Sequence, residues 1–402
     1  GIDPYISQLP ASASALLVEF QADNQTALTA SVDSFLQGCS AFSLLKFPSF
    51  SIAEKERNFL WKIRKGLFPS VGAVRKKGTT VILEDIAFPV ANLGDAIGDL
   101  QVLFDTYNYP DAIIFGHAKD GNIHFVVTQP FDTPAEVDRY DAFIRAVVDL
   151  VVRKYNGSLK AEHGTGRNMA PFVETEWGGD AYAIMKTVKQ LADPLGLLNP
   201  GVIINENQQA HITNLKELPE VEEEVDKCIE CGYCEPNCPS RNFTTSPRRR
   251  IVIRRALAKM KQSGKPKEYR ELLHQFSYDG LETCAVDGLC ATSCPVDINT
   301  GDLVKRLRRE SHAPAANAAA VFTARHFGAI TVLVRTLLKT GLLLNSITGR
   351  NTMLRLTRQV KKVQQSFPLW SNYLLPPPAL VKAPVLQPGN ASTIVYFPAC
   401  IS

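Results

Sequence analysis

The sequence predicts an α+β fold in which a domain with an antiparallel sheet precedes an α-helical, cysteine-bearing domain. Over residues 11–205, apolar runs of strand length alternate with amphipathic helical segments. Seven of the nine cysteines lie within residues 228–294. Residues 313–365 are rich in Leu and Ala and have a helical pattern. A length of 402 residues fits two or three domains of ordinary size.

The elements of the first domain follow from local periodicity. In the longest helical segment, Val137, Phe143 and Val147 recur at helical spacing. Breaker residues at 193–196 end the last helix. We expect strands at 15–20, 80–86, 111–117, 122–128 and 158–162, and helices at 24–37, 92–107, 134–156 and 179–192.

Composition and charge exclude several classes of protein. Lys and Arg number 44 against 40 Asp and Glu, and this balance argues against a protein that grips nucleic acid through overall charge. The hydrophobic share of 45% argues against disorder. We see neither a secretory signal nor an apolar run of about 18 residues, so we expect no transmembrane helix. The amphipathic stretch near 327–345 is expected to be a buried helix, with a membrane or quinone contact as the alternative.

Composition shifts divide the chain into five parts. Both ends carry strand-like runs without tails, so we expect a piece of a larger protein. The acidic run at 217–226 lies in a polar linker, and we assign it no role. The expected parts are the first domain at 1–205, the linker at 206–227, the cysteine-bearing domain at 228–312, a helical segment with a Pro-rich linker at 313–386, and the truncated start of another domain at 387–402.

The first cysteine run has the spacing of a bacterial ferredoxin loop. Residues 228–239 read CIECGYCEPNCP, which is C-x2-C-x2-C-x3-C-P. Three thiolates on such a loop bind three corners of a four-iron cluster, and the fourth Cys commonly ligates a second cluster. Disulfides and zinc are the alternatives. No signal peptide supports an oxidising compartment, and zinc sites usually use two CxxC pairs, so we favour iron–sulfur clusters.

A second run, CAVDGLCATSCP at 284–295, has the same offsets, with Asp287 in place of the second Cys. Pairing across the runs predicts a [4Fe-4S] cluster on Cys228, Cys231, Cys234 and Cys294. The second cluster would take Cys238, Cys284 and Cys290, with Asp287 as a candidate fourth ligand. A carboxylate is a harder ligand than a thiolate, so this cluster is either [3Fe-4S] or a four-iron cluster with a labile corner.

A basic segment, 248–270, separates the two runs. We interpret most of its cations as a solvated helix face, with some offsetting the negative charge of the clusters. It has little aromatic interleaving, which argues against nucleic-acid binding. Cys39 stands alone in the first domain and is expected to be a packing residue.

Two histidines flank a predicted hairpin turn at Asp120-Gly121. With a two-residue turn, His117 and His124 lie directly opposite, with Cβ atoms about 5 Å apart. They would then bind one divalent cation, although single strand histidines are more often packed core residues. Residues 162–167 add a carboxylate, Glu162, and another imidazole, His163. Two His and one Glu suit zinc, manganese or iron(II), and a free imidazole beside them is a natural general base.

These segments resemble the C-terminal domain of FAD-linked oxidases of the vanillyl-alcohol-oxidase type. That family includes D-lactate dehydrogenases, glycolate oxidase subunits and D-2-hydroxyglutarate dehydrogenases. The matching motifs are GHAKDGNIHF (116–125), SLKAEHGTGR (158–167) and DPLGLLNPG (193–201). The continuation into both cysteine runs is similar to bacterial fusion enzymes with flavin and iron–sulfur domains. RKGLFPSVGAVRKKGTT (64–80) and EDIAFP (84–89) resemble the D-2-hydroxyglutarate dehydrogenase type among these.

The resemblance implies roles for individual residues. His117, His124 and Glu162 would be the ligands of a divalent metal such as Zn, Mn or Fe. His163 would remove the hydroxyl proton as hydride leaves for the flavin of FAD. The metal would hold the hydroxyl group and the α-carboxylate of the substrate. The implied substrate contacts are Arg64 for a carboxylate, Arg75 and Lys160 for a distal carboxylate, and Asn122 for orienting a ligand. Some relatives have a substrate-contacting Lys where this chain has Glu84-Asp85, which puts that contact in doubt.

The resemblance also implies a function. The chain would be part of a flavin-dependent D-2-hydroxyacid dehydrogenase acting on D-2-hydroxyglutarate, with D-lactate or glycolate as the alternative substrates. It would pass electrons through its clusters to a quinone or redox protein. The flavin-binding domain that precedes this region in the family is absent, and the segment YFPAC, with Cys400, is similar to the start of a cysteine-rich α/β domain. A non-catalytic iron–sulfur electron-transfer subunit is the other alternative. We expect a cytoplasmic homo-oligomer, or one peripheral at the inner membrane.

Overall fold

The computed structural model describes residues 10, 13–365, 367–371 and 373–374, and the side chains of 66–74 are outside this description. The chain forms two compact units, residues 1–307 and 308–402. The expected start of a cysteine-rich domain at 387–402, with Cys400, lies outside the described residues. Within them, the strands are β1 (Thr80–Ala87), β2 (Ile113–His117) and β3 (Asn122–Gln129). The α-helices are α1 (Gln25–Cys39), α2 (Glu54–Val74), α3 (Leu93–Thr106), α4 (Pro134–Val148), α5 (Val173–Trp177), α6 (Gly179–Ala192), α7 (Glu223–Asp226), α8 (Pro247–Gln262), α9 (Pro266–Phe276), α10 (Thr300–Ser311), α11 (Pro314–Arg325), α12 (Phe327–Thr348) and α13 (Thr352–Val363).

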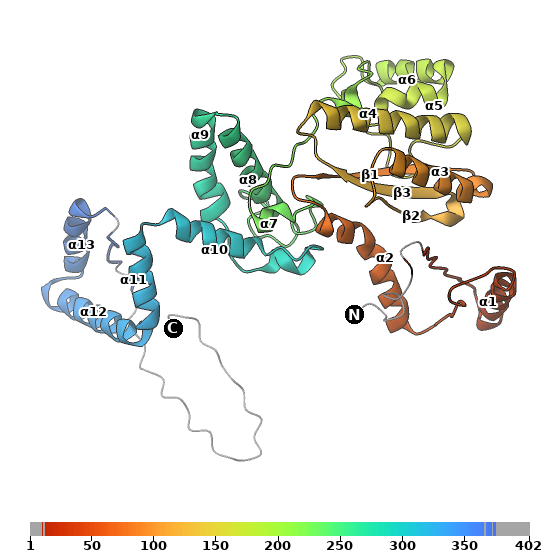
Figure 1. Ribbon diagram of the computed structural model, residues 1–402. Coiled ribbons are helices and arrows are strands. Elements are labelled where there is room, and N and C mark those ends of the chain that lie inside the picture. Colours follow the sequence, from red (N-terminus) through yellow and green to blue (C-terminus); the bar gives the residue numbers. More distant parts are fainter. Residues whose placement is uncertain (1–9, 11–12, 366, 372, 375–402) are drawn as a thin grey trace, which may run out of the picture. The chain divides into compact units, whose positions relative to one another are not determined.

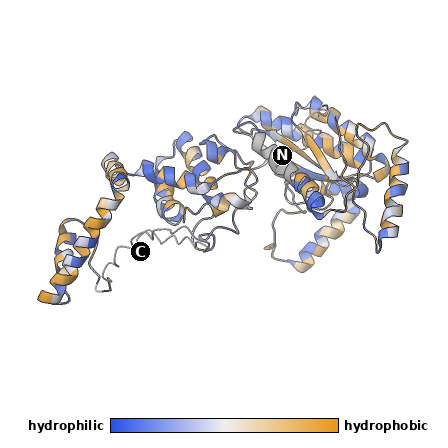
Figure 2. Cartoon of the chain, turned by 90° about the horizontal axis from the view of Figure 1, so that it is seen from below, coloured by the Kyte–Doolittle hydropathy of each residue, from blue (hydrophilic) through white to orange (hydrophobic). Residues whose placement is uncertain are grey.

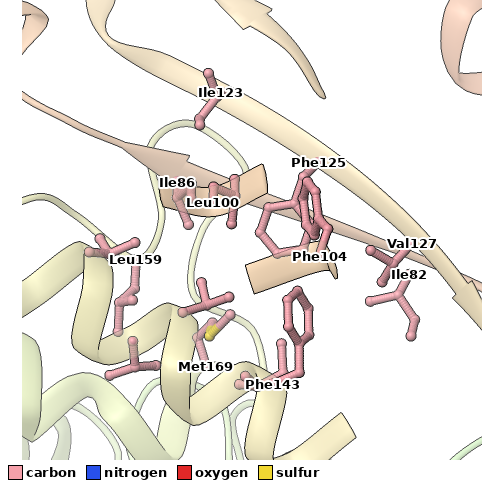
Figure 3. Packing of buried hydrophobic residues seen from close by; sticks show 14 of the residues in the cluster. Ile82, Ile86, Leu100, Phe104, Ile123, Phe125, Val127, Phe143, Leu159 and Met169 are labelled. Atoms are coloured by element: carbon pink, nitrogen blue, oxygen red, sulfur yellow. The ribbon is translucent and has the colours of Figure 1, made fainter. Parts of the chain in front are cut away.

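The sheet of the first domain is antiparallel, as predicted, and has the strand order β1-β3-β2. Helices α3 and α4 pack on one of its faces (Figure 1). Ile123, Phe125 and Val127 alternate along β3 and belong to this core, where Phe125 packs against Phe104 of α3 and Phe143 of α4 (Figure 3). Because side chains alternate along a strand, Asn122 and His124 point to the opposite face. That face carries the candidate site.

Two predicted strands were wrong. Residues 15–20 are irregular, and Leu16 is 79% exposed. Phe20 packs instead against Phe35 and Phe50, at ring centroid distances of 5.6 and 5.7 Å. Residues 158–162 form only one bridge, between Ser158 and Ala87. Helix α2 was not predicted, because Pro69 and two glycines stand where a helix interior usually excludes them.

A second hydrophobic core lies under the cysteine runs. Val225 of α7, Ile251 of α8, Phe276 of α9 and Leu303 of α10 are all at most 2% exposed within it. The acidic run, to which the sequence assigned no role, contributes Glu222 to this packing. Glu222 pairs with Arg254 and Arg306, both at 2.7 Å, and so joins α8 to α10.

The unit 308–402 contains three consecutive helices in its described part, α11 to α13. Helix α12 is long and apolar enough to cross a membrane by length and composition, contrary to the expectation from the sequence. Only 6% of its most apolar window is buried, so the expectation of a buried helix was also wrong. Figure 2 shows both hydrophobic and hydrophilic residues on these helices, of which α12 is the most apolar.

Because β2 and β3 approach closely at Gly116, we expect a side chain at this position to destabilise the protein. A Cβ atom there would lie 2.3 Å from Asn122 O and 2.7 Å from Ile123 Cα. Both are backbone atoms, so the strands must separate. We expect Gly116→Ala to lower the free energy of unfolding by about 2 kcal/mol, measured by denaturant titration. Gly98→Ala, in the exposed interior of α3 with nothing within 4 Å, is the control and should raise it slightly. Equal effects would contradict the packing argument.

Candidate functional site

The hairpin carries its two histidines on one face, although the predicted register was wrong. His117 lies opposite Asn122, and His124 lies opposite Phe115. The loop therefore spans residues 118–121 rather than two residues, and Gly121 closes it with a φ of 68°. The observed pairing of β2 with β3 differs from the predicted register by two residues. A shift by an even number of residues leaves every side chain on the predicted face of the sheet. The imidazole centroids of His117 and His124 are 5.9 Å apart.

Glu162 completes a group of three metal-type donors. Its Oε1 atom lies 3.1 Å from His124 Nε2 and 3.5 Å from His117 Nε2. His124 is 5% exposed as a side chain, whereas His117 and Glu162 are each 49% exposed. The three donor atoms lie within 4.8 Å of one another. This arrangement anchors one ligand in the sheet and leaves the other side of the group open to solvent.

Asp85 organises this group, and the sequence analysis missed it. Its carboxylate is fully buried on β1 opposite His124. Oδ2 accepts hydrogen bonds from the backbone N–H groups of Ala161, Glu162 and His163, at 3.1, 2.7 and 2.8 Å. Oδ1 accepts one from Asn122 Nδ2 at 2.7 Å. The segment 161–163 therefore turns toward Asp85 instead of continuing as a strand.

Hydrogen bonding keeps Asp85 ionised. Burial alone raises the pKa of a carboxyl group, but the N–H groups of His163 and Glu162 and the Asn122 amide outweigh it and hold the pKa of Asp85 below its usual range. The role predicted for Asn122, that of orienting a ligand, fits this contact. It acts through Asp85, and its own Oδ1 is buried without a hydrogen-bond partner among the described residues.

The buried His124 has the properties of a metal ligand. Burial lowers its pKa, more than neighbouring Asp85 raises it, so the ring is neutral near pH 7. Its Nδ1 atom lies 3.3 Å from Asp85 Oδ1, and its Nε2 atom points at Glu162. A histidine that faces a carboxylate with one nitrogen and a cation with the other is the usual arrangement in metal sites. The donors present therefore fit a divalent metal.

An overlapping group of Asp85, His124 and His163 also has donor atoms within 4.8 Å. Its Asp85 carboxylate already accepts four hydrogen bonds, so the group with Glu162 is the better candidate. His163 stacks on His124 with ring centroids 4.7 Å apart and planes 9° apart. Its Nε2 atom is 3.9 Å from Glu162 Oε1, and its side chain is 46% exposed. His163 thus lies beside the donor group with a ring open to solvent.

The predicted substrate contacts separate into two sets. Arg64 lies at the site: its Nη2 atom donates to Gly116 O at 3.3 Å, and its guanidinium lies 5.3 Å from the Phe115 ring centroid. Lys160 instead pairs with buried Glu84 at 2.5 Å, on the core face of the sheet. Arg75 donates to the carbonyl groups of 226–228, at the first cysteine loop. The structure thus engages Lys160 and Arg75 in contacts that a distal substrate carboxylate would have to replace.

The four cysteines predicted for the first cluster come from two segments of the chain, and the structure brings three of them near the fourth. The pKa of Cys234 is raised to about 12, mainly by burial and in part by the neighbouring Cys228, Cys294 and Cys231. Backbone N–H groups point at this sulfur cluster: Glu230 N lies 3.3 Å from Cys228 Sγ, and Ile298 N lies 3.2 Å from Cys294 Sγ. Such donors stabilise thiolates, so the group fits an iron–sulfur cluster.

The second group also converges. Cys238, Cys284, Cys290 and Asp287 line one cavity, together with Arg250. Asp287 is exposed, and its Oδ1 accepts a hydrogen bond from Leu289 N at 3.1 Å, so it has a turn-forming role beside any ligand role. Most cations of the basic segment were interpreted as a solvated face, with some offsetting cluster charge. Arg250 and Arg255, which are 1% and 4% exposed, do not lie on a solvated face.

The two cysteine loops have the same backbone form. In the first, Glu230 and Gly232 have positive φ, at offsets of two and four from Cys228. In the second, Val286 and Gly288 have positive φ, at the same offsets from Cys284. A β-branched residue adopts this conformation only under strong constraint. Asp287 therefore occupies the position that Cys231 has in the first loop.

Comparison with known proteins agrees with both the candidate metal site of the first domain and the cysteine groups of the second. Residues 6–203 match the family described as FAD linked oxidases, C-terminal domain. Residues 224–298 match the 4Fe-4S dicluster domain. Residues 6–203 are therefore similar to the C-terminal domain of FAD linked oxidases, and residues 224–298 are similar to a 4Fe-4S dicluster domain. The predictions of an FAD-linked oxidase fold and of iron–sulfur binding are confirmed at this level.

Named relatives support the same assignment. The D-2-hydroxyglutarate dehydrogenase of Pseudomonas putida is 26% identical over 357 residues, which cover 74% of this chain and 34% of that protein. The glycolate oxidase subunit GlcD of Bacillus subtilis is 30% identical over 33% of this chain and 28% of its own length. The D-2-hydroxyglutarate dehydrogenase of Stutzerimonas stutzeri is 28% identical over 46% of this chain and 39% of its length. The chain thus spans 28 to 39% of these relatives.

The contacts of Asp85 in the FAD-linked oxidase domain yield a test. In Asp85→Asn, an amide replaces the carboxylate and only one acceptor oxygen remains, so either the three N–H groups that share Oδ2 or the Asn122 amide that donates to Oδ1 loses its acceptor. We expect the free energy of unfolding to fall by about 3 kcal/mol and bound divalent metal to fall with it. Denaturant titration and elemental analysis measure the two effects. Asp105→Asn, at an exposed position in α3, is the control. Full metal content in Asp85→Asn would contradict the organising role.

Proposed function

We propose that the chain supplies the substrate site and the iron–sulfur electron path of a flavin-dependent D-2-hydroxyacid dehydrogenase. The observation that carries this proposal is the convergence of His117, His124 and Glu162 beside the exposed ring of His163, with Arg64 adjacent. A purely electron-transferring subunit has no use for such a group. The described residues thus offer a cation site, a base and a carboxylate anchor on one face of the sheet.

Each of these residues has a distinct task in the proposed reaction. Arg64 binds the α-carboxylate of the substrate and so fixes its orientation. His117, His124 and Glu162 hold the divalent cation, which is Zn, Mn or Fe, against the hydroxyl group. His163 takes the hydroxyl proton. When bound, the divalent cation polarises the hydroxyl group, and FAD accepts the hydride from the carbon that carries it.

We propose D-2-hydroxyglutarate as the substrate. Relatives named for this activity include the Pseudomonas putida protein, whose match extends across both domains of this chain. D-lactate and glycolate are the alternatives, and the Bacillus subtilis protein named as a glycolate oxidase subunit supports the second. A dicarboxylate needs a second cation, and Arg75 and Lys160 are available only if their present contacts are exchanged.

The clusters would carry electrons one at a time from the flavin to an acceptor, a quinone or a redox protein. Cys228, Cys231, Cys234 and Cys294 would bind a [4Fe-4S] cluster. Cys238, Cys284 and Cys290 would bind the second cluster. Because Asp287 is exposed and partly engaged by its turn, we propose that the second cluster is [3Fe-4S] or has a labile fourth iron. We propose a homo-oligomer that is cytoplasmic or peripheral at the inner membrane.

Steady-state kinetics of the flavin-loaded holoenzyme tests the function. We expect kcat/KM for D-2-hydroxyglutarate to exceed the values for D-lactate and glycolate by at least about tenfold, because binding of a second carboxylate adds a charge-assisted contact. A preference for lactate or glycolate would reject the proposed substrate but keep the reaction class. Absence of turnover on all three acids would reject the class.

Histidine variants link this turnover to the donor group. We expect His124→Ala and His117→Ala to lose bound divalent metal and to lower kcat by more than about 100-fold. The matched control is His274→Ala, at an exposed position on α9, which should retain both. Normal metal content in His124→Ala would reject the ligand assignment, whatever its effect on turnover.

A further inference from the structure

A buried arginine lies in the wall of the second cysteine cavity. Arg250, on α8, is the largest fully buried side chain of the described residues, at 1% exposure. It lines the same cavity as Cys238, Cys284 and Cys290. An arginine side chain remains protonated in proteins, so this is a full positive charge removed from water.

The protein provides hydrogen-bond acceptors for only some of the N–H groups of this guanidinium. Nε donates to Gly280 O at 2.7 Å, and Nη1 lies 3.7 Å from Cys238 Sγ. Nη2 is buried and has no hydrogen-bond partner among the described residues. Among those residues no carboxylate forms an ion pair with Arg250 either. Burying a charge without an ion-pair partner lowers the stability of a protein. We therefore expect a negatively charged group in the cavity to balance Arg250.

Arg255, one turn and a half further along α8, shows the contrast. It is also buried, but its Nη1 atom pairs with Glu230, and its Nη2 atom donates to the carbonyl groups of Val225 and Cys228 at 2.8 and 2.9 Å. Its charge is balanced within the protein. Arg250 therefore differs from its neighbour in having sulfur atoms, rather than a carboxylate, in front of it.

We propose that Arg250 is the counter-ion of the second cluster and raises its reduction potential. Its Nη atoms would donate to Cys238 Sγ and to another sulfur of the cluster. Each electron that enters makes a thiolate-ligated cluster more negative, and a fixed positive charge at hydrogen-bond distance stabilises the reduced form more than the oxidised one. Arg250 is thus a positioning and tuning residue. This inference rests on the proposed electron-carrying role of the second cluster.

Redox titration of the anaerobically prepared holoenzyme, followed by electron paramagnetic resonance, tests this role. In Arg250→Met, we expect iron and sulfide to be retained, the midpoint potential of the second cluster to shift downward and that of the first to stay unchanged. Arg250→Lys keeps the charge and should shift the potential less. The control is Arg249→Met, at the exposed neighbouring position, which should leave both potentials unchanged.

The outcomes separate the possible failures. An unchanged potential in Arg250→Met with both clusters present overturns the counter-ion role. Loss of the second cluster in Arg250→Met supports it only if Arg250→Lys retains that cluster, and loss in both variants shows a purely structural residue and overturns it. Wild-type iron sufficient for one cluster alone would overturn the second cluster itself, a failure visible before any variant is made.

A separate observation concerns α12 in the unit 308–402. Its exposed face is apolar: Val332, Leu333, Leu337, Leu343, Leu344 and Ile347 are each 39 to 73% exposed. At 100° per residue these positions fall on one side of the helix, and only threonine and alanine lie between them. On α13, Leu356, Val360 and Val363 form a second exposed apolar stripe at helical spacing.

The charge around these stripes has a single sign. Residues 311–374 contain eight Lys and Arg and no Asp or Glu, although the chain has 40 acidic residues. Two of the cations, Arg335 and Lys339, lie near the middle of α12, where a membrane-spanning helix would have to bury them in hydrocarbon. An apolar face with cations beside it is typical of a helix that lies in the plane of an anionic bilayer surface.

We infer that α12 and α13 dock on the surface of an anionic lipid bilayer. Flotation of the full chain with vesicles tests this. We expect it to float with phosphatidylcholine vesicles that contain phosphatidylglycerol, to float less with phosphatidylcholine alone, and to be released by high salt. The double variant Leu337→Glu with Ile347→Glu should stay unbound. Val188→Glu with Leu191→Glu, at exposed apolar positions on α6, is the matched control and should still float.

Two results would overturn the docking. One is the absence of flotation with anionic vesicles. The other is light scattering that shows a stable oligomer which only Leu337→Glu with Ile347→Glu dissociates, since a second copy of the chain would then cover this face. Binding that both double variants retain equally would show that the face of α12 is not responsible, and would also overturn it.

Discussion

The candidate site of the first domain depends on one buried carboxylate. Asp85 on β1 accepts three consecutive backbone N–H groups from 161–163, and it also faces His124 on β3. The adjacent Glu84 points to the other face, where it holds the side chain of Lys160. Two adjacent acidic residues of β1 thus bind the segment 160–163 from opposite faces of the sheet. These contacts bring Glu162 and His163 close to His117 and His124.

Sequence reasoning found the members of the site but not the contact that joins them. His117 and His124 were placed on one face from an Asp-Gly turn, and the true loop is two residues longer. The two histidines still share a face because the predicted register was wrong by an even number of residues. Residues 158–162 were read as a strand because apolar content favours one. Local sequence could not show the role of Asp85, which is 76 residues or more away in sequence. Asp85 accepts hydrogen bonds from the N–H groups that would otherwise pair with a neighbouring strand.

In the iron–sulfur domain, cysteine spacing predicted two groups of ligands, and the cysteines of each group lie near one another in the structure. Each ferredoxin-type loop is a local structure that sequence offsets determine. The repeated positive φ at Glu230 and Val286 shows that the loop form persists where Asp287 replaces a cysteine. The basic segment was harder. A run of cations resembles a solvated face by composition, and the burial of Arg250 depends on a cavity built from residues 238–301, which no local pattern shows.

Charge compensation explains why these sites differ. Asp85 is balanced by peptide dipoles and Asn122, Glu84 by Lys160, and Arg255 by Glu230, so the charge of each is compensated within the protein, although Arg255 Nε has no hydrogen-bond partner among the described residues. Arg250 and the group of His117, His124 and Glu162 are not compensated in this way among those residues. Arg250 has a buried guanidinium nitrogen without a hydrogen-bond partner among the described residues and faces thiols, whereas the group with Glu162 has imidazole and carboxylate donors that are partly open to solvent. Because an unpaired buried charge is costly, a cofactor bound in front of Arg250 would add to the stability of the fold itself.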